Sequence, residues 1–186
     1  MTTNLVTLET PEASGVVCYS YLESPLGDLC VRGDGCSITG LFLPQHKRWD
    51  GPAAGWRRAD DCFEEVRRQL AEYFAGERTA FDVPLKLTGT PFQRRVWEEL
   101  LQIPFGETVT YQELARRLGK PSASRAVGHA NGCNPVSILV PCHRVVGARG
   151  KLTGYAGGLA RKRWLLEWER SVQATSIVAR RASAAT

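Results

Sequence analysis

The sequence contains no apolar stretch that approaches the roughly 18 residues of a membrane-spanning helix. Its first 15 residues, MTTNLVTLETPEASG, also lack the basic start and apolar run of a secretion signal. Both absences predict an intracellular, cytoplasmic protein with no membrane partner.

Clustered metal ligands are missing as well. No two of the six cysteines are spaced as CxxC, and the three histidines, His46, His129 and His143, are scattered along the chain. A zinc site needs such ligands close together, so we expect no metal. Without a secretion signal, reduced thiols are the expected state of all six cysteines. No organic cofactor is implied by any motif.

Charge is distributed unevenly along the chain. Residues 1–85 carry 8 Lys and Arg against 13 Asp and Glu, net −5, whereas residues 86–186 carry 16 against 6, net +10. The asymmetry suggests that the C-terminal half meets a polyanion, nucleic acid being the commonest. The acidic half would then be a scaffold that faces away from this partner. With 186 residues, 43% of them hydrophobic, the chain is long enough for one domain or two small ones.

The N-terminal half shows a β-then-α pattern. Strands are predicted at 16–22, 29–32 and 37–43, with SPLG as the first turn and Gly-Asp-Gly as a hairpin signal between the second and third. An amphipathic helix follows over 61–75, and Gly76 suits its C-terminal cap. We expect an antiparallel meander with one helix.

The C-terminal half is mostly helical. The segment 83–89 is predicted to be a linker, and Thr90-Pro91-Phe92-Gln93 is a capping box that opens a helix to about Gln102. Short helices are expected from Thr110 to Gly119 and over 122–129, which together resemble a helix-turn-helix.

The last part of the chain contains a buried apolar run at 136–140, predicted to be a strand, and a helix at 161–169. Residues 171–186 are rich in Ala, Ser and Arg without clear periodicity, which predicts a flexible tail. The predicted domains are therefore 1–88, with a polar start over 1–15, and 89–170.

Cys142 is the cysteine whose surroundings best fit a nucleophile. It follows the predicted strand and is framed by His143 and Arg144, and nearby positive charge favours the thiolate. His143 is a candidate base acting through a bridging water, and Glu169 a candidate partner that orients its imidazole. The alternatives are an inert buried cysteine, a surface imidazole and a solvated helix carboxylate.

Two further polar residues are candidates on local grounds. Asn134 precedes Pro135 and is placed to tie the turn to the Cys142 segment, although a plain turn Asn is an equal alternative. Arg125, in the second helix of the predicted helix-turn-helix, is placed to contact phosphates or a groove, the alternative being a solvated Arg.

Longer motifs carry a resemblance to a known family. The string PCHRV at 141–145, preceded by Asn134-Pro135 and followed by YAGG at 155–158, is similar to the active-site signature of the O6-alkylguanine-DNA alkyltransferases. TYQELARRLG, SRAVG and RKRWLLEWE extend the resemblance over about 90–170, and SPLG resembles the more variable N-terminal half. Members of this family transfer an alkyl group from O6 of guanine in DNA irreversibly to their own cysteine.

The resemblance implies a fold and a reaction. It implies an N-terminal ribonuclease-H-like α/β domain followed by a mostly α winged helix-turn-helix domain. The substrate would be double-stranded DNA containing O6-alkylguanine, bound through the minor groove after base flipping, with O4-methylthymine as a second candidate lesion. Transfer would be stoichiometric and without metal or cofactor. We expect a monomer, and leave cooperative binding along DNA open.

The resemblance also assigns roles residue by residue. It implies Cys142 as nucleophile with a lowered thiol pKa, His143 as base through water, Glu169 as the residue that orients His143, and Asn134 as the residue that positions the turn. It further implies Tyr111 as the proton donor to guanine and a DNA contact, and Arg125 as the arginine that intercalates into the base stack. Ala126 and Arg144 are the other implied DNA contacts. The implied base-pocket residues are Val145, Tyr155 and Ala156.

Departures from the family pattern are few. Position 156 is often Ser and is Ala here, but the contact expected there is made by backbone N–H. His129 and Cys133 stand where smaller residues are common, which raises the question of a second reactive thiol. The larger relatives' cysteine-rich module for phosphotriester repair is absent, which implies a stand-alone repair protein.

Three rival functions fit parts of the pattern. A Cys/His hydrolase or acyltransferase would share the nucleophile and base but turn over repeatedly through a thioester. A non-catalytic alkyltransferase-like lesion sensor would share the fold but lack the cysteine, which Cys142 argues against. A plain helix-turn-helix regulator would show a preference for base sequence in binding.

Overall fold

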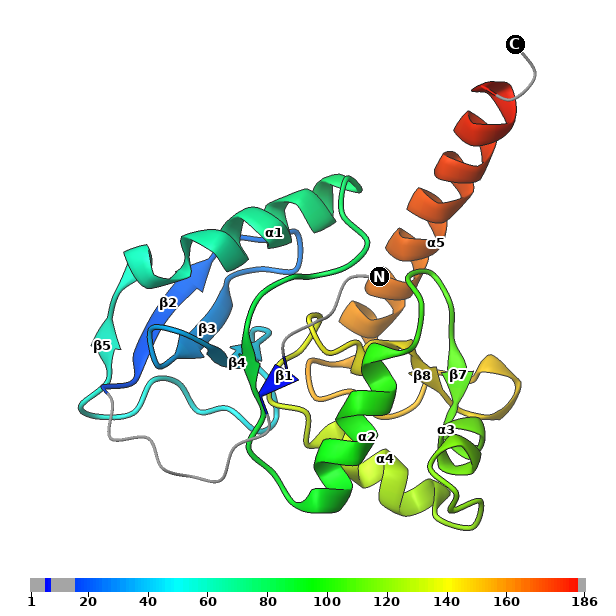
Figure 1. Ribbon diagram of the computed structural model, residues 1–186, viewed down its shortest axis with the longest axis horizontal. Helices are drawn as coiled ribbons and strands as arrows, with labels where there is room; N and C mark the ends of the chain where they lie inside the picture. Colours follow the sequence, from blue (N-terminus) through cyan, green and yellow to red (C-terminus); the bar gives the residue numbers. More distant parts are fainter. Residues whose placement is uncertain (1–5, 8–15, 184–186) are drawn as a thin grey trace.

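The computed structural model of the 186-residue chain describes residues 6–7 and 16–183. A sheet covered by one helix forms the N-terminal part, and a group of shorter helices forms the C-terminal part beside it (Figure 1). The predicted two-part architecture is confirmed. The polar start at 1–15 lies largely outside the described residues.

The sheet has six strands in the order β1-β6-β4-β3-β2-β5. Its centre is the predicted antiparallel meander, which consists of β2 (Cys18–Leu22), β3 (Leu29–Gly33) and β4 (Ile38–Phe42). The SPLG turn closes with a hydrogen bond from Gly27 N to Ser24 O at 3.0 Å, and Gly27 adopts φ +92°. Two-residue strands complete the sheet: β1 (Val6–Thr7), β5 (Arg57–Arg58) and β6 (Leu85–Lys86).

The predicted linker at 83–89 is part of this sheet, so that prediction is wrong. β6 pairs in parallel with β1 and with β4, and Val83, Leu85 and Leu87 are buried. Apolar residues at every second position are the pattern of a strand with one face in the core. Pro84 and the change of charge sign obscured that pattern in the sequence.

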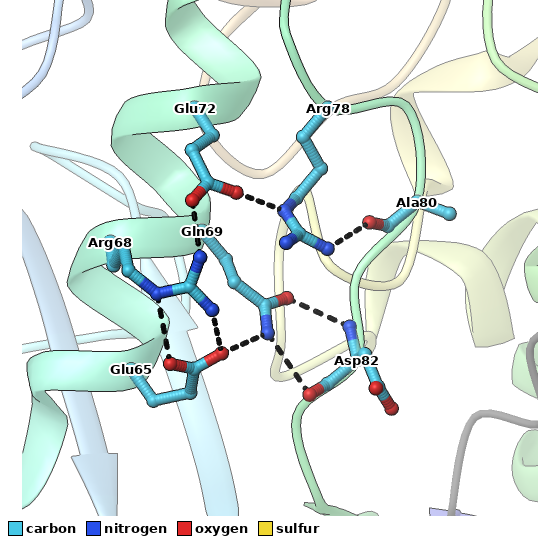
Figure 2. A network of polar contacts seen from close by, with 7 residues as sticks. All are labelled: Glu65, Arg68, Gln69, Glu72, Arg78, Ala80 and Asp82. Atoms are coloured by element: carbon cyan, nitrogen blue, oxygen red, sulfur yellow. Dashed lines mark hydrogen bonds and ion pairs between the residues drawn. The ribbon is translucent and has the colours of Figure 1, made fainter.

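The helix α1 (Glu64–Ala75) follows a short 3-10 turn, η1 (Asp60–Phe63), and lies across one face of the sheet (Figure 1). Gly76 caps it with φ +80°, as predicted. Polar contacts link α1 to the irregular segment that follows it. Figure 2 shows Arg68 between two glutamates, Arg78 paired with Glu72, and Gln69 bonded to the backbone of Asp82.

The C-terminal part begins with the predicted capping box. Thr90 and Gln93 bond each other's backbone N–H groups at the start of α2 (Pro91–Leu101). The helices α3 (Tyr111–Arg117) and α4 (Ser124–Gly132) form the helix-turn-helix, and β7 (Val109–Thr110) pairs with β8 (Val145–Val146) beside them. Trp97 of α2 holds α4 in place by donating to Ala130 O at 2.9 Å.

The last helix, α5 (Leu159–Ser183), runs far beyond its predicted end. The prediction of a flexible tail from residue 171 is therefore wrong for residues 171–183, which project from the body of the protein as helix (Figure 1). Once residues 159–169 have formed helical turns, adding further residues costs no new nucleation, and this segment contains no Gly or Pro. Gln173 still contacts the body through Phe105 O at 3.3 Å.

The predicted strand at 136–140 is also absent as a regular element. Isolated bridges join Val136 to Leu41 and Ser137 to Val140, and the rest of the segment is an irregular but buried turn. Within this turn Ile138 has φ +71°, which is strained for a β-branched side chain. Bonds from Leu41 N to Pro135 O and from Ser137 N to Leu41 O, each 2.9 Å, attach the turn to β4.

Among residues 6–7 and 16–183, no helix combines the length and apolarity required to span a membrane.

Candidate active site

Cys142 lies at the start of a 3-10 turn, η2 (Cys142–Arg144), directly after the irregular turn. Only 4% of the residue is exposed. Asn134 shapes the approach to it by donating from Nδ2 to Val136 O at 3.3 Å and to Val140 O at 2.9 Å, while its Oδ1 accepts from Val136 N at 3.0 Å. These three bonds tie together the segment from Asn134 to Val140, which leads directly to Cys142.

Glu169 of α5 is fully buried and accepts hydrogen bonds from four residues in three parts of the chain. Its Oε1 accepts from Tyr73 OH at 2.8 Å, His143 Nε2 at 2.9 Å and Arg144 Nη2 at 2.9 Å. Its Oε2 accepts from Arg144 Nε at 2.9 Å and Gly106 N at 3.0 Å. Although burial opposes ionisation, the contacts with His143 and Arg144 hold the pKa of Glu169 far below its ordinary value. The alternative of a solvated carboxylate does not hold.

These contacts define the protonation of His143. Burial lowers the pKa of its imidazole, outweighing the opposite effect of Glu169, so the ring is favoured in its neutral form. Because Nε2 faces an ionised carboxylate, the single ring proton resides on Nε2. Nδ1 is then a free acceptor, and it is buried without a hydrogen-bond partner among the described residues. Within residues 6–7 and 16–183, no hydrogen bond joins the His143 ring directly to the Cys142 thiol.

The thiol itself behaves differently from the expectation. Burial raises the pKa of Cys142, and it outweighs the lowering effects of Asn134, Lys162 and nearby backbone N–H groups. The expected depression of the thiol pKa is therefore wrong for the protein without DNA. In a closed, apolar turn the thiol is favoured over the thiolate, and formation of the nucleophile requires a base.

Lys162 belongs to this site and was missed by the sequence analysis. It is fully buried, and Nζ donates to Val145 O at 2.6 Å and to Thr153 O at 2.8 Å. Burial lowers the pKa of Lys162 to about 8. The signal available in the sequence was its spacing of seven residues from Glu169, which places both on one face of a helix.

Of the other residues predicted at the site, Tyr111 and Tyr155 lie close enough to Cys142 for its charge to affect the pKa of their hydroxyls. Tyr111 is half-buried and its hydroxyl donates to Thr153 O at 3.3 Å, while the Lys162 ammonium lies 5.9 Å from its ring centre. Burial raises the pKa of Tyr111. Val145 and Tyr155 are buried and Ala156 is half-buried.

The residues predicted to contact DNA differ in exposure between α4 and η2. Arg125 and Ala126 are exposed on α4, whereas Val127 and Ala130 of the same helix are buried. Arg144, in contrast, is only 6% exposed and donates to Glu169 and to Ile103 O at 2.6 Å. The predicted DNA contact of Arg144 is therefore wrong: its guanidinium is used inside the protein to neutralise Glu169.

The described residues hold no group of three or more His, Cys, Asp or Glu side chains arranged to bind a metal ion.

The fold and the site together define a class of protein. A buried cysteine follows a structured turn, its neighbouring imidazole is held by a carboxylate, and a helix-turn-helix presents an exposed arginine nearby. This is a thiol-dependent group-transfer protein built on a nucleic-acid-binding fold.

The comparisons give the particular family. The model for "6-O-methylguanine DNA methyltransferase, ribonuclease-like domain" matches residues 17–87, and that for its "DNA binding domain" matches residues 91–171. The chain belongs to the 6-O-methylguanine DNA methyltransferase family.

Named relatives agree with this assignment. "Methylated-DNA--protein-cysteine methyltransferase" of Mycobacterium tuberculosis is 50% identical over 156 residues, which cover 84% of this chain and 94% of that protein. The protein of that name from Methanosarcina acetivorans is 49% identical over 82% of this chain and 98% of its own length. The crystal structure of Mycobacterium tuberculosis OGT in complex with DNA superposes with a TM-score of 0.79 at 50% identity, over 83% of this chain and 94% of that one.

Proposed function

We propose that this chain repairs DNA by moving the alkyl group of O6-alkylguanine to Cys142. The observation that carries the proposal is the buried hydrogen bond of 2.9 Å between His143 Nε2 and Glu169, next to a buried cysteine in a matched alkyltransferase domain. It supplies a neutral imidazole with a free nitrogen beside a thiol that needs deprotonation.

The reaction is a displacement at carbon. The Cys142 proton passes to His143 Nδ1 through a bridging water, since no direct contact joins the two side chains. The thiolate then attacks the alkyl carbon, an S–C bond forms and the C–O6 bond breaks. The electron pair goes to the guanine, which takes a proton from Tyr111 and stays in the DNA strand as neutral guanine. The proton held by His143 then passes through water to the Tyr111 phenolate, which restores both side chains to their neutral forms. The thioether product resists hydrolysis, so each protein molecule acts once.

Asn134 and Lys162 support this step without moving the proton themselves. Asn134 holds the turn and favours the thiolate, and the Lys162 ammonium also favours negative charge on Cys142. Both effects oppose the desolvation of the thiol. The positive charge that the His143 imidazole gains with the proton would also favour the thiolate and so lower the raised pKa of Cys142.

The alkylated base must leave the duplex to reach a buried sulfur. Flipping costs a few kcal/mol, least for a damaged base that pairs poorly. Arg125, exposed on α4, is placed to fill the space the base leaves, with α4 in the minor groove and Ala126 against the backbone. Val145, Tyr155 and Ala156 would form the walls of the base pocket. The protein would bind as a monomer. It would need no base-specific contacts outside the lesion, because repair has to proceed in any flanking sequence.

The direct test is the mass of the Cys142 peptide after incubation with a duplex that contains one O6-methylguanine. We expect a gain of one methyl group per molecule, none in Cys142→Ser, and an unchanged gain in the matched variant Cys133→Ser. An unmodified Cys142 peptide with the lesion intact refutes the proposal. Methylation of Cys133 in place of Cys142 moves the activity to the other thiol, and repeated turnover supports the hydrolase alternative.

A further inference from the structure

A cavity of about 220 Å³ opens beside the proposed base pocket, and its walls come from both domains. One wall belongs to α4, through Gly128 and His129, and a second consists of residues 154–156. The third wall is the loop between β4 and β5, which contributes Lys47 and Arg48. The acidic N-terminal domain therefore places two cations next to the site.

These two side chains differ from every other cation in their half of the chain. Residues 1–85 contain eight Lys and Arg residues. Six are engaged inside the domain by aromatic rings, hydrogen bonds or carboxylates, two of them visible in Figure 2: Arg32, Arg57, Arg58, Arg67, Arg68 and Arg78. Among the described residues, the exposed side chains of Lys47 and Arg48 have neither a hydrogen bond nor a carboxylate partner.

The loop that carries them is rigidly held. Lys47 N donates to Ala156 O at 3.0 Å, which ties the loop to the pocket wall. His46 is only 4% exposed, its Nδ1 accepts from Arg48 N at 3.3 Å, and its ring packs edge-on against Phe42. Trp49 stacks on Phe42 with ring centres 4.1 Å apart. The backbone of Lys47 and Arg48 is thus held at the rim of the cavity, and their side chains extend from it with their charges unpaired among the described residues.

We infer that Lys47 and Arg48 bind the DNA phosphates that flank the flipped nucleotide, and so make the N-terminal domain part of the DNA interface. The inference rests on the proposed function. A flipped nucleotide brings its own two phosphates to the mouth of the pocket. An otherwise acidic domain repels the DNA phosphates. Because Lys47 and Arg48, at the edge of the cavity, are unpaired within the described part of the chain, the domain instead attracts phosphates at the place where the lesion is held.

The test removes both charges in the variant Lys47→Gln/Arg48→Gln. A matched control, Arg57→Gln/Arg58→Gln, loses the same charge from β5, the edge strand of the same sheet far from the C-terminal helices (Figure 1). Binding to a duplex with one O6-methylguanine is measured between 50 and 200 mM salt, about the range over which phosphate contacts dominate affinity. A Cys142→Ser background keeps the lesion intact.

We expect the Lys47/Arg48 variant to bind about ten- to a hundredfold more weakly, with a plot of log affinity against log salt shallower by about 1.8. The control should change the slope much less. In proteins that retain Cys142, transfer from free O6-benzylguanine should stay within about twofold of wild type, because a free base has no phosphates; this also shows that the variant is folded.

Equal changes in both double variants, or an unchanged salt slope in the Lys47/Arg48 variant, would overturn the inference. Loss of reactivity towards the free base would also count against it, since the loop would then act on the pocket and not on phosphates. If the wild-type protein transfers no methyl group from DNA to Cys142, the proposed function fails; if it does and only the salt slope is unchanged, this inference fails alone.

Discussion

Replacing Glu169 with Gln tests the buried carboxylate on which the site depends. Glu169 accepts six hydrogen bonds, from Tyr73, Gly106, His143 and Arg144. Both oxygens face N–H or O–H donors, so the NH₂ group of Gln opposes donors in either orientation. The Arg144 guanidinium also loses its counterion while it stays buried. Removing one partner of a buried ion pair costs about 3–5 kcal/mol.

That loss has two measurable consequences. For a protein of this size it lowers the thermal midpoint by about 6–20 °C. The tautomer of His143 is no longer fixed, and because a positioned general base contributes about 10²- to 10⁴-fold, we expect methyl transfer to slow by that order. Circular dichroism melts and single-turnover quench measurements with excess protein give the two numbers.

Glu167→Gln is the matched control, because Glu167 lies two residues earlier in α5 and is exposed. It should melt and react like the wild type. The reasoning is refuted if Glu169→Gln matches Glu167→Gln in both measurements.

The stability that Glu169 contributes should also depend on pH in a predictable direction. The pKa of Glu169 is depressed in the folded state, so its contribution to stability is present above its ordinary value of 4.5 and is lost as pH falls below it. The gap between Glu169→Gln and wild type should therefore narrow in acid.

Two further predictions address charges near the reacting groups. Lys162→Met removes the ammonium that favours the Cys142 thiolate, so the pH at half-maximal alkylation of Cys142 by iodoacetamide should move upward. An unchanged pH profile would show that Lys162 acts only through its hydrogen bonds to backbone carbonyl groups such as that of Val145. Arg125→Ala should slow methyl transfer from duplex DNA by at least about tenfold while transfer from free O6-benzylguanine stays near wild type, since filling the gap in the stack matters only in DNA. Equal losses on both substrates would exclude a role in flipping.

Several features were predictable because their causes are local. The turn at Gly27, the helix cap at Gly76 and the capping box of Thr90 and Gln93 depend on residues within a few positions of one another. The meander and the helix-turn-helix follow from hydrophobic periodicity of the same short range. Cys142 was identified from its immediate neighbours and from a motif that can be recognised in the sequence without any knowledge of packing.

The errors share a different cause. The segment 83–89 looked like a linker until its pairing with β4 was known, and a helix end at residue 169 could not be separated from a longer helix by periodicity alone. Arg144 looked like a DNA contact because its sequence context is basic. Whether an arginine meets phosphate or a buried carboxylate depends on which distant segment packs against it.

The sequence by itself determined most of the order of elements, the candidate nucleophile and its neighbouring imidazole, and the basic character of the half that contains them. Only the tertiary structure decided the electrostatics of the site. Glu167 and Glu169 are alike in sequence, and one is solvated while the other is buried among four donors. The pKa of Cys142 is raised and not lowered because burial, which is summed over the whole fold, outweighs the charges beside it. Local chemistry selects the reactive groups, but the dielectric and the partners that set their charge come from residues far apart in the chain.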